Sequence, residues 1–230
     1  MKTLTVLIFL LPLTGFGIAE ASPPNWGGRY APCDRHADLL NRGSMDLAVR
    51  FSTSNTVLAQ QFARAMDFWT GVLDLEWHQV ESEDCSIQLV DGTPALFDWC
   101  TCMSARSQFP DRPGFEGWIA FNPRLKLTKQ EMFLDSVHEI GHLLGLPHNS
   151  SELSVMYAFE LDKAAALDAA DLDALAARHK LRSDLPIDKG GEARVRVVAP
   201  GPNAVRRASS GQNTMGFVPV SPDRHYGLAE

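Results

Sequence analysis

After its first 13 residues, the sequence contains no uninterrupted apolar run of the roughly 20 residues that a membrane-spanning helix requires. An excess of positive charge is also absent, because 21 Lys and Arg residues stand against 28 Asp and Glu residues for a net charge of −7. An acidic chain argues against nucleic acid as a partner. No internal repeat is visible, which excludes an array of stacked repeats. We therefore expect a monomeric globular protein with no membrane span.

The N-terminal 21 residues differ in composition from the rest of the chain. Lys2 precedes an apolar run over residues 4–13, which is too short for a membrane anchor, and an A-x-A sequence follows at residues 19–21. This order is typical of a secretory signal peptide, so we expect residues 1–21 to be removed and the mature chain to begin near Ser22. The protein is therefore expected to be secreted, or periplasmic if it comes from a Gram-negative bacterium.

Cysteine is scarce, and the four positions are Cys33, Cys85, Cys100 and Cys102. An even number in an exported protein indicates two disulfides, with three pairings open. A bond between Cys100 and Cys102 is the least expected, because only one residue separates them and the bridge would be strained. We favour a pairing of Cys33 and Cys85 each with one of the other two. A metal site at Cys100 and Cys102 is a weaker interpretation, since no partner His or Cys is close in sequence.

The first structured elements follow a lead-in, residues 22–44, which is rich in Pro and Gly and is expected to be extended. Residues 45–52 partly alternate between apolar and polar, which predicts a strand. Ser54 or Asn55 can then cap a helix of about four turns. Its apolar stripe recurs at helical spacing and consists of Leu58, Phe62, Ala65 and Trp69.

Three further short strands are predicted before the next helix. Residues 74–80, 85–90 and 117–122 are short segments rich in apolar residues, and a turn signal follows the second of them. Residues 93–117 contain three Pro residues and are expected to form an irregular loop. A loop of this length in a compact domain is often functional or held by cross-links.

Three of the seven histidines lie in one window of eleven residues that reads H-E-x-x-H-x-x-G-x-x-H. His138 and His142 are four residues apart, so on a helix they lie on one face and reach one metal ion. Gly145 accepts the left-handed conformation that ends a helix, and the turn brings back His148 as third ligand. Three imidazole ligands suit zinc and leave its fourth position open for water, which is typical of a catalytic site.

Glu139 follows the first ligand directly and is not needed for coordination, so it is the candidate general base. Thr128 and Glu131 form a T-x-x-E capping box that opens the helix carrying the motif. That helix is expected to be buried because its apolar residues cover a broad surface. These residues are Phe133, Leu134, Val137, Ile140, Leu143 and Leu144.

The chain after the motif contains one more predicted helix. Residues 149–151 form an N-glycosylation sequon, which we expect to be unused because it adjoins a metal ligand. Asp168 can cap a last helix in the alanine- and leucine-rich residues 164–180. Residues 183–230, with repeated Gly, Pro and Ser, are expected to form a flexible tail.

The order of these elements, the histidine motif and a downstream methionine resemble the metzincins, and among them most closely the matrixins. In matrixins a methionine eight residues after the third histidine lies in a tight turn under the zinc, and Met156, followed by Tyr157, has this place after His148. The resemblance covers residues 45–182, the expected catalytic domain. It implies an α+β fold with a small twisted mixed sheet, about three helices and one catalytic zinc.

Some features of matrixins are missing. Their last helix usually opens with two adjacent acids, where this chain has Ala170 and Asp171. The family implies that the first acid pairs with the mature N-terminus and that the second, here Asp171, holds the Met-turn. The Pro after Met-Tyr, the P-R-C-G-x-P-D propeptide sequence and the histidine cluster for a second, structural zinc are not found. Calcium is a possible further cofactor, but no motif supports it.

These residues favour a secreted zinc endopeptidase acting on protein or peptide substrates, with Glu139 as general base. Two alternatives stay open. A zinc domain used only for adhesion or binding would need the three ligands alone, so the intact Glu139 argues against it. A zinc hydrolase of another bond, such as that of a small non-protein amide, is the second alternative, which the sequence does not exclude.

Overall fold

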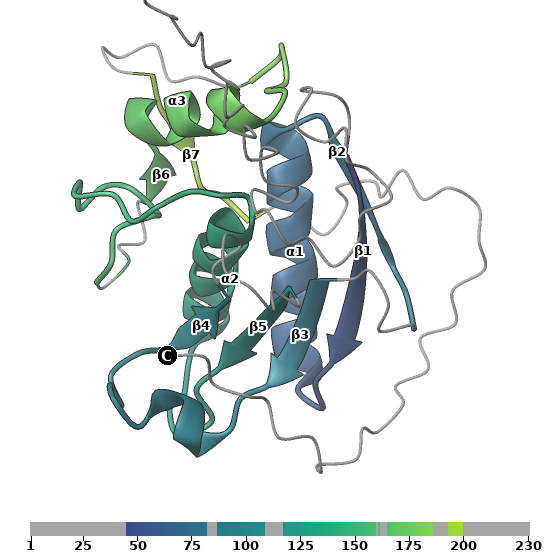
Figure 1. Ribbon diagram of the computed structural model, residues 1–230, viewed down its shortest axis with the longest axis vertical. Coiled ribbons are helices and arrows are strands. Elements are labelled where there is room, and N and C mark those ends of the chain that lie inside the picture. Colours follow the sequence, from purple (N-terminus) through teal and green to yellow (C-terminus); the bar gives the residue numbers. More distant parts are fainter. Residues whose placement is uncertain are drawn as a thin grey trace, which may run out of the picture.

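The computed structural model describes residues 45–81, 87–108, 117–159, 161, 165–185 and 193–199. A five-stranded mixed sheet forms the centre of this part of the chain (Figure 1). Its strands are β1 (Met45–Ser52), β2 (Leu75–Gln79), β3 (Ile87–Asp91), β4 (Ala105–Ser107) and β5 (Trp118–Phe121). They lie in the order β2-β1-β3-β5-β4, with β4 antiparallel to β5 and all other neighbours parallel. The expected signal peptide and the whole of the expected lead-in, residues 22–44, fall outside the described residues.

Two long helices, α1 (Thr56–Val72) and α2 (Lys129–Leu143), pack against each other, and a shorter helix, α3 (Ala169–Arg178), follows later in the chain (Figure 1). Buried apolar side chains of β1, α1, β3 and α2 form one continuous core. Within it, the indole Nε1 of Trp69 donates a hydrogen bond to the carbonyl oxygen of Val137, at 3.3 Å. The expected fold, a small mixed sheet with three helices, is confirmed.

Side chains at the helix starts explain where the helices begin. Asn55 caps α1 by accepting a hydrogen bond from the backbone N–H of Leu58 at 3.0 Å. At α2 the expected capping box is complete, since the Glu131 carboxylate accepts from the Thr128 N–H at 2.6 Å and the Thr128 hydroxyl accepts from the Glu131 N–H at 3.2 Å. Each cap satisfies backbone donors that have no partner inside the helix.

The connection between β3 and β5 is more ordered than the sequence suggests. It contains a short 3₁₀ helix, η2 (Pro94–Phe97), and the strand β4, where an irregular loop was expected. A small second core stabilises it, in which Phe97 is fully buried and packs with Val90 and Ala120. With only three residues, β4 is too short to show an alternating pattern, so the expectation of an irregular loop was wrong.

The β3–β5 connection also contains a disulfide that differs from the expected pairing. Cys100 and Cys102 are bonded to each other, the pairing that was least expected. A tight turn around these residues brings their Cα atoms to 5.3 Å, a distance that a disulfide can span. Cys33 and Cys85 lie outside the described residues.

A second, two-stranded sheet joins β6 (Ala166–Leu167) to β7 (Val195–Arg196) in antiparallel fashion. Val195 and Val197 are buried in the main core. The expectation of a flexible tail from residue 183 onward was therefore wrong for residues 193–199. The two buried valines lie in a segment rich in Gly, Pro and Ser, so the sequence pattern alone did not indicate a strand there. In the described part of the chain, no helix has the length and apolarity needed to cross a membrane.

Candidate metal centre

The C-terminal half of α2 carries the first two histidines of the motif and the glutamate between them. His138, Glu139 and His142 are 8%, 7% and 6% exposed, so all three face the interior. The helix ends at Leu143, and Gly145, two residues later, has a φ of 89° in the left-handed region. The chain reverses there and returns His148 to the end of the helix, where its side chain is exposed.

The three histidine side chains converge on one point. One ring nitrogen of each lies within 4.8 Å of the corresponding atoms of the other two, and the Nε2 atoms of His142 and His148 are 3.2 Å apart. Two nitrogens bound to a tetrahedral zinc at 2.0–2.1 Å would lie about 3.4 Å apart. In the described ranges this is the only group of three or more His, Cys, Asp or Glu side chains that could hold a metal ion.

Backbone carbonyls orient two of these rings. The Nδ1 of His138 lies 2.7 Å from the carbonyl oxygen of Val155, and the Nδ1 of His142 lies 2.8 Å from that of Leu146. A carbonyl oxygen can only accept, so each ring donates from Nδ1 and presents the lone pair of Nε2 to a metal. The donor set and its support therefore fit zinc.

Burial also keeps these rings in the form that binds metal. It lowers the pKa of His138 to about 4 and, together with the neighbouring His138, that of His142 to about 4. Both imidazoles are then neutral near pH 7. A metal does not have to displace a proton from either ring at that pH.

Glu139 is held in a buried position beside the histidines. Burial raises the pKa of its carboxyl, while His142 and hydrogen bonds from the side chain and backbone of Ser107 lower it. Ser107 belongs to β4, so a strand that the sequence did not reveal contributes a contact to the site. Nothing in the sequence around a single serine on a three-residue strand signals this contact.

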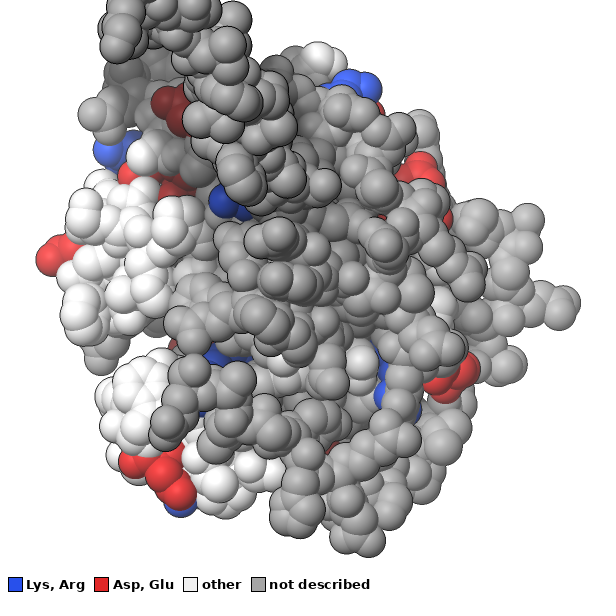
Figure 2. Space-filling view, viewed as in Figure 1, with Lys and Arg blue, Asp and Glu red and all other residues white. Residues whose placement is uncertain are grey.

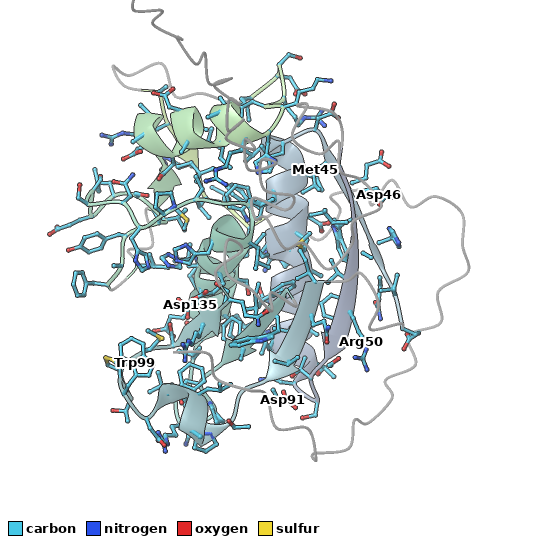
Figure 3. The ribbon with its side chains drawn as sticks, viewed as in Figure 1. Met45, Asp46, Arg50, Asp91, Trp99 and Asp135 are labelled. Carbon is cyan, nitrogen blue, oxygen red and sulfur yellow. A yellow bond between two sulfur atoms is a disulfide. The ribbon has the colours of Figure 1, made fainter. Side chains whose placement is uncertain are left out.

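A second carboxyl lies one helical turn before Glu139, on the same face of α2. Figure 3 shows the Asp135 side chain between α2 and β4. Burial raises the pKa of Asp135 to about 7, a hydrogen bond with Ser104 lowers it, and Glu139 and Glu131 raise it further. Its Oδ2 is buried and has no hydrogen-bond partner among the described residues. The sequence pattern gave no reason to single out Asp135.

Asp135→Asn is expected to stabilise the protein at alkaline pH. The folded-state pKa of Asp135, about 7, lies above the ordinary 3.8, so the folded protein retains a proton that the unfolded chain has released. The free energy of unfolding of the native protein therefore falls as the pH rises from about 4 to 7. Asn cannot ionise, and the variant should be more stable at pH 8 by ~1–3 kcal/mol, the usual cost of an incompletely hydrogen-bonded buried polar group.

Urea unfolding of both zinc-free proteins at pH 5 and pH 8 measures this difference. The gap should be smaller at pH 5 than at pH 8, because most of the pH interval over which the native protein loses stability, from about 4 to 7, lies above pH 5. An equal gap at both pH values would show that the carboxyl does not titrate in this range.

Met156 lies in a turn below the histidines. It is fully buried, and its sulfur is so close to α2 that a Cβ added at Gly141 would lie 2.6 Å from it. The Met156 N–H donates to the Ser154 hydroxyl at 2.9 Å, and that hydroxyl donates to Asp171 at 2.6 Å. Asp171 thus reaches the turn through Ser154. Burial raises the pKa of the Asp171 carboxyl, and the hydrogen bonds that it accepts lower it.

Tyr157 follows Met156 in the chain. It is half-buried, and its ring contacts that of Phe159 edge to face, with centroids 5.4 Å apart. Phe159 is 75% exposed. Trp99, labelled in Figure 3 on the β3–β4 connection, is 67% exposed. Figure 2 shows mainly uncharged side chains on both projections at the left of the molecule, one after α2 and one between β3 and β4.

Gly145→Ala is expected to lower the free energy of unfolding by ~1–2 kcal/mol, the cost of a left-handed conformation for a residue with a side chain. The added Cβ would also lie 2.8 Å from the Nη1 of Arg178. Gly71→Ala in α1 is the matched control, because its Cβ would meet no atom within 4 Å and alanine favours the helix. Urea unfolding should separate the two, and equal stability changes would contradict the role assigned to the turn.

Comparison with known proteins places this site in a family. The family model described as "Matrixin" matches residues 47–179, which is more than half of the 230-residue chain. This range contains α1, α2, α3, all of the main sheet except the first two residues of β1, and all three histidines of the metal centre.

Three relatives align over shorter stretches. Macrophage metalloelastase of Rattus norvegicus is 30% identical over 105 residues, which are 42% of this chain and 22% of that protein. Matrix metalloproteinase-26 of Homo sapiens is 32% identical over 108 residues, 40% of this chain and 39% of that protein. Metalloendoproteinase 1-MMP of Arabidopsis thaliana is 32% identical over 111 residues, 42% of this chain and 30% of that protein. The aligned part spans less than half the length of each relative, but the family match covers the folded centre of the chain, and the protein therefore belongs to the matrixin family.

Proposed function

We propose that this protein is a zinc metalloendopeptidase whose zinc is held by His138, His142 and His148. The observation that carries the proposal is the convergence of three imidazoles beside a buried carboxyl, Glu139, that is not one of the ligands. A site that only retains a metal does not require a buried acid, and burial of an ionisable group costs free energy. The names of the three relatives, a metalloelastase, a matrix metalloproteinase and a metalloendoproteinase, support the same activity.

The chemistry divides between the metal and the protein. Zinc, when bound, supplies a Lewis acid that acidifies water and polarises the carbonyl of the scissile bond. Glu139 accepts the proton of the attacking water and later delivers it to the leaving amine. Its raised pKa favours the first transfer, because a buried carboxylate is a stronger base than one in water. Ser107 holds the carboxyl in place through its hydrogen bonds.

We further propose that the substrate is an extended peptide segment. β4 pairs only with β5 among the described strands, so it lies at the edge of the sheet, and its Ser107 contacts Glu139. A peptide that pairs with this edge passes directly in front of the general base. The exposed Trp99 and Phe159 offer apolar surface for its side chains. Such a substrate is extracellular if the expected signal peptide directs secretion.

Incubation of the purified protein with a denatured protein and with a peptide library tests the proposal. Cleavage of internal peptide bonds should stop when a zinc chelator is added and return with zinc. Tight zinc binding without cleavage of any peptide would favour a binding domain over an enzyme. Hydrolysis restricted to small non-peptide amides would identify a different hydrolase.

A further inference from the structure

The third ligand of the metal centre is supported differently from the other two. His138 and His142 each donate from Nδ1 to a backbone carbonyl. His148 makes no such hydrogen bond to a described residue, and its side chain is exposed. It also follows the end of the helix, so the hydrogen bonds of α2 do not fix its backbone. The position of His148 must therefore come from its neighbours in the chain.

Asn149, the next residue, makes contacts that can hold His148 in its position. Its backbone N–H donates to the carbonyl oxygen of Met156 at 2.8 Å. Its side-chain Nδ2 donates to Asp168 at 3.0 Å and to Asp171 at 2.9 Å, and its Oδ1 accepts from the Ser151 N–H at 2.9 Å. Every hydrogen-bonding group of the Asn149 side chain is thus used.

The two carboxylates that Asn149 contacts are themselves fixed. Asp168 and Asp171 form the capping box at the start of α3, in which each carboxylate accepts the backbone N–H of the other residue at 3.1 Å. Asp171 also accepts from Ser154 in the turn that contains Met156. Asn149 therefore lies between a rigid helix start and the backbone of a metal ligand.

We propose that Asn149 is the positioning residue of the metal centre, holding His148 in place by tying its backbone to the acid pair Asp168 and Asp171. This inference rests on the proposed zinc site but not on the proposed peptidase activity. Two hydrogen bonds to carboxylates are stronger than ordinary neutral ones. They act on the one ligand whose ring lacks a backbone partner of its own in the described structure.

The hydrogen bonds of the Asn149 side chain also bear on whether the sequon at residues 149–151 can be glycosylated. A glycan would be attached to Nδ2 of Asn149, the atom that donates both hydrogen bonds. The amide of a modified Asn keeps only one N–H, so at least one carboxylate would lose its partner. A glycan would also have to fit between the loop and the start of α3. In the folded protein Asn149 therefore positions His148 and carries no glycan.

The decisive measurement is the zinc affinity of the full chain, obtained by competition with a chelator of known affinity. Asn149→Ala removes both hydrogen bonds and is expected to weaken zinc binding by ~10–100-fold, as is usual when the support of a ligand is lost. Ser151→Ala is the matched control. It destroys the sequon but keeps the backbone N–H that Asn149 accepts from, and its zinc affinity should equal that of the native protein.

A second comparison separates positioning from general loss of stability. Leu47 belongs to β1 and is far along the chain from the metal centre. Leu47→Ala creates a cavity in the hydrophobic core, so it should lower the unfolding temperature without changing zinc affinity. The absorption spectrum of bound cobalt, which reports ligand geometry, should change in Asn149→Ala and stay native in Leu47→Ala and Ser151→Ala.

Native zinc affinity and a native cobalt spectrum in Asn149→Ala would overturn the inference. So would a glycan found by mass spectrometry on Asn149 of folded, zinc-loaded protein made in a glycosylating host. If Asn149→Ala does not fold, Asn149→Ser provides the test, since its shorter side chain keeps a polar group but does not reach the acid pair. A native protein that binds zinc tightly yet cleaves no peptide would contradict the proposed function and leave this inference intact.

Discussion

Replacing Glu139 with Gln is expected to reduce kcat/KM for peptide cleavage by ~10²–10⁴, the usual contribution of a general base. Gln has the size of Glu and keeps a polar contact with Ser107, but it cannot accept the proton of the attacking water. The zinc content should remain at about one per chain, because Glu139 is not among the three converging ligands. The variant should also be at least as stable as the native protein, since burial raises the pKa of Glu139 and Gln avoids the cost of a buried charge.

Glu152→Gln is the control for this variant. Glu152 is an exposed carboxylate in the loop that follows the third histidine, and the same change of charge there should leave kcat/KM within about twofold of the native value. Cleavage rates and elemental analysis on the same samples measure both quantities. Native activity in Glu139→Gln would mean that another group accepts the proton.

Replacing His142 with Ala is expected to abolish tight zinc binding, because two imidazoles rarely hold zinc against water and competing ligands. Activity should fall to background. The unfolding temperature should no longer rise when zinc is added, since a metal stabilises a protein only by binding its folded state more tightly. Equilibrium dialysis followed by elemental analysis gives the number of zinc ions per chain.

His78→Ala is the matched histidine control. His78 is exposed, lies in β2 and pairs with Asp46 at 2.9 Å, away from the three converging rings. One zinc should remain in this variant and none in His142→Ala. Two tightly held zinc ions in the native protein would contradict the expectation that a second, structural site is missing.

Much of the fold could be predicted because the signals were local. Asn55, Thr128 and Asp168 cap their helices through contacts to residues three positions ahead, so a short stretch of sequence contains the whole interaction. The spacing of the histidines is also a local signal. His138 and His142 are one helical turn apart, and Gly145 supplies the reversal that returns the chain.

The parts that could not be predicted depend on contacts between distant segments. β4 is recognisable only from its pairing with β5, and its Ser107 becomes part of the site only because β4 lies against α2. Asp135 looks like a surface residue of an amphipathic helix until the connection that contains Ser104 covers it. The bond between Cys100 and Cys102 depends on a tight turn that sequence spacing alone does not reveal.

The short strand β7 has a practical consequence for recombinant expression. The family match ends at residue 179, yet β7 lies beyond it and pairs with β6. The Ala166 carbonyl of β6 accepts from the Val155 N–H at 2.8 Å, and the Val155 carbonyl orients His138. A protein truncated at the family boundary would lose this strand and its buried valines, and with them the outer support of a metal ligand. Expression of the folded matrixin domain should therefore extend at least to residue 199.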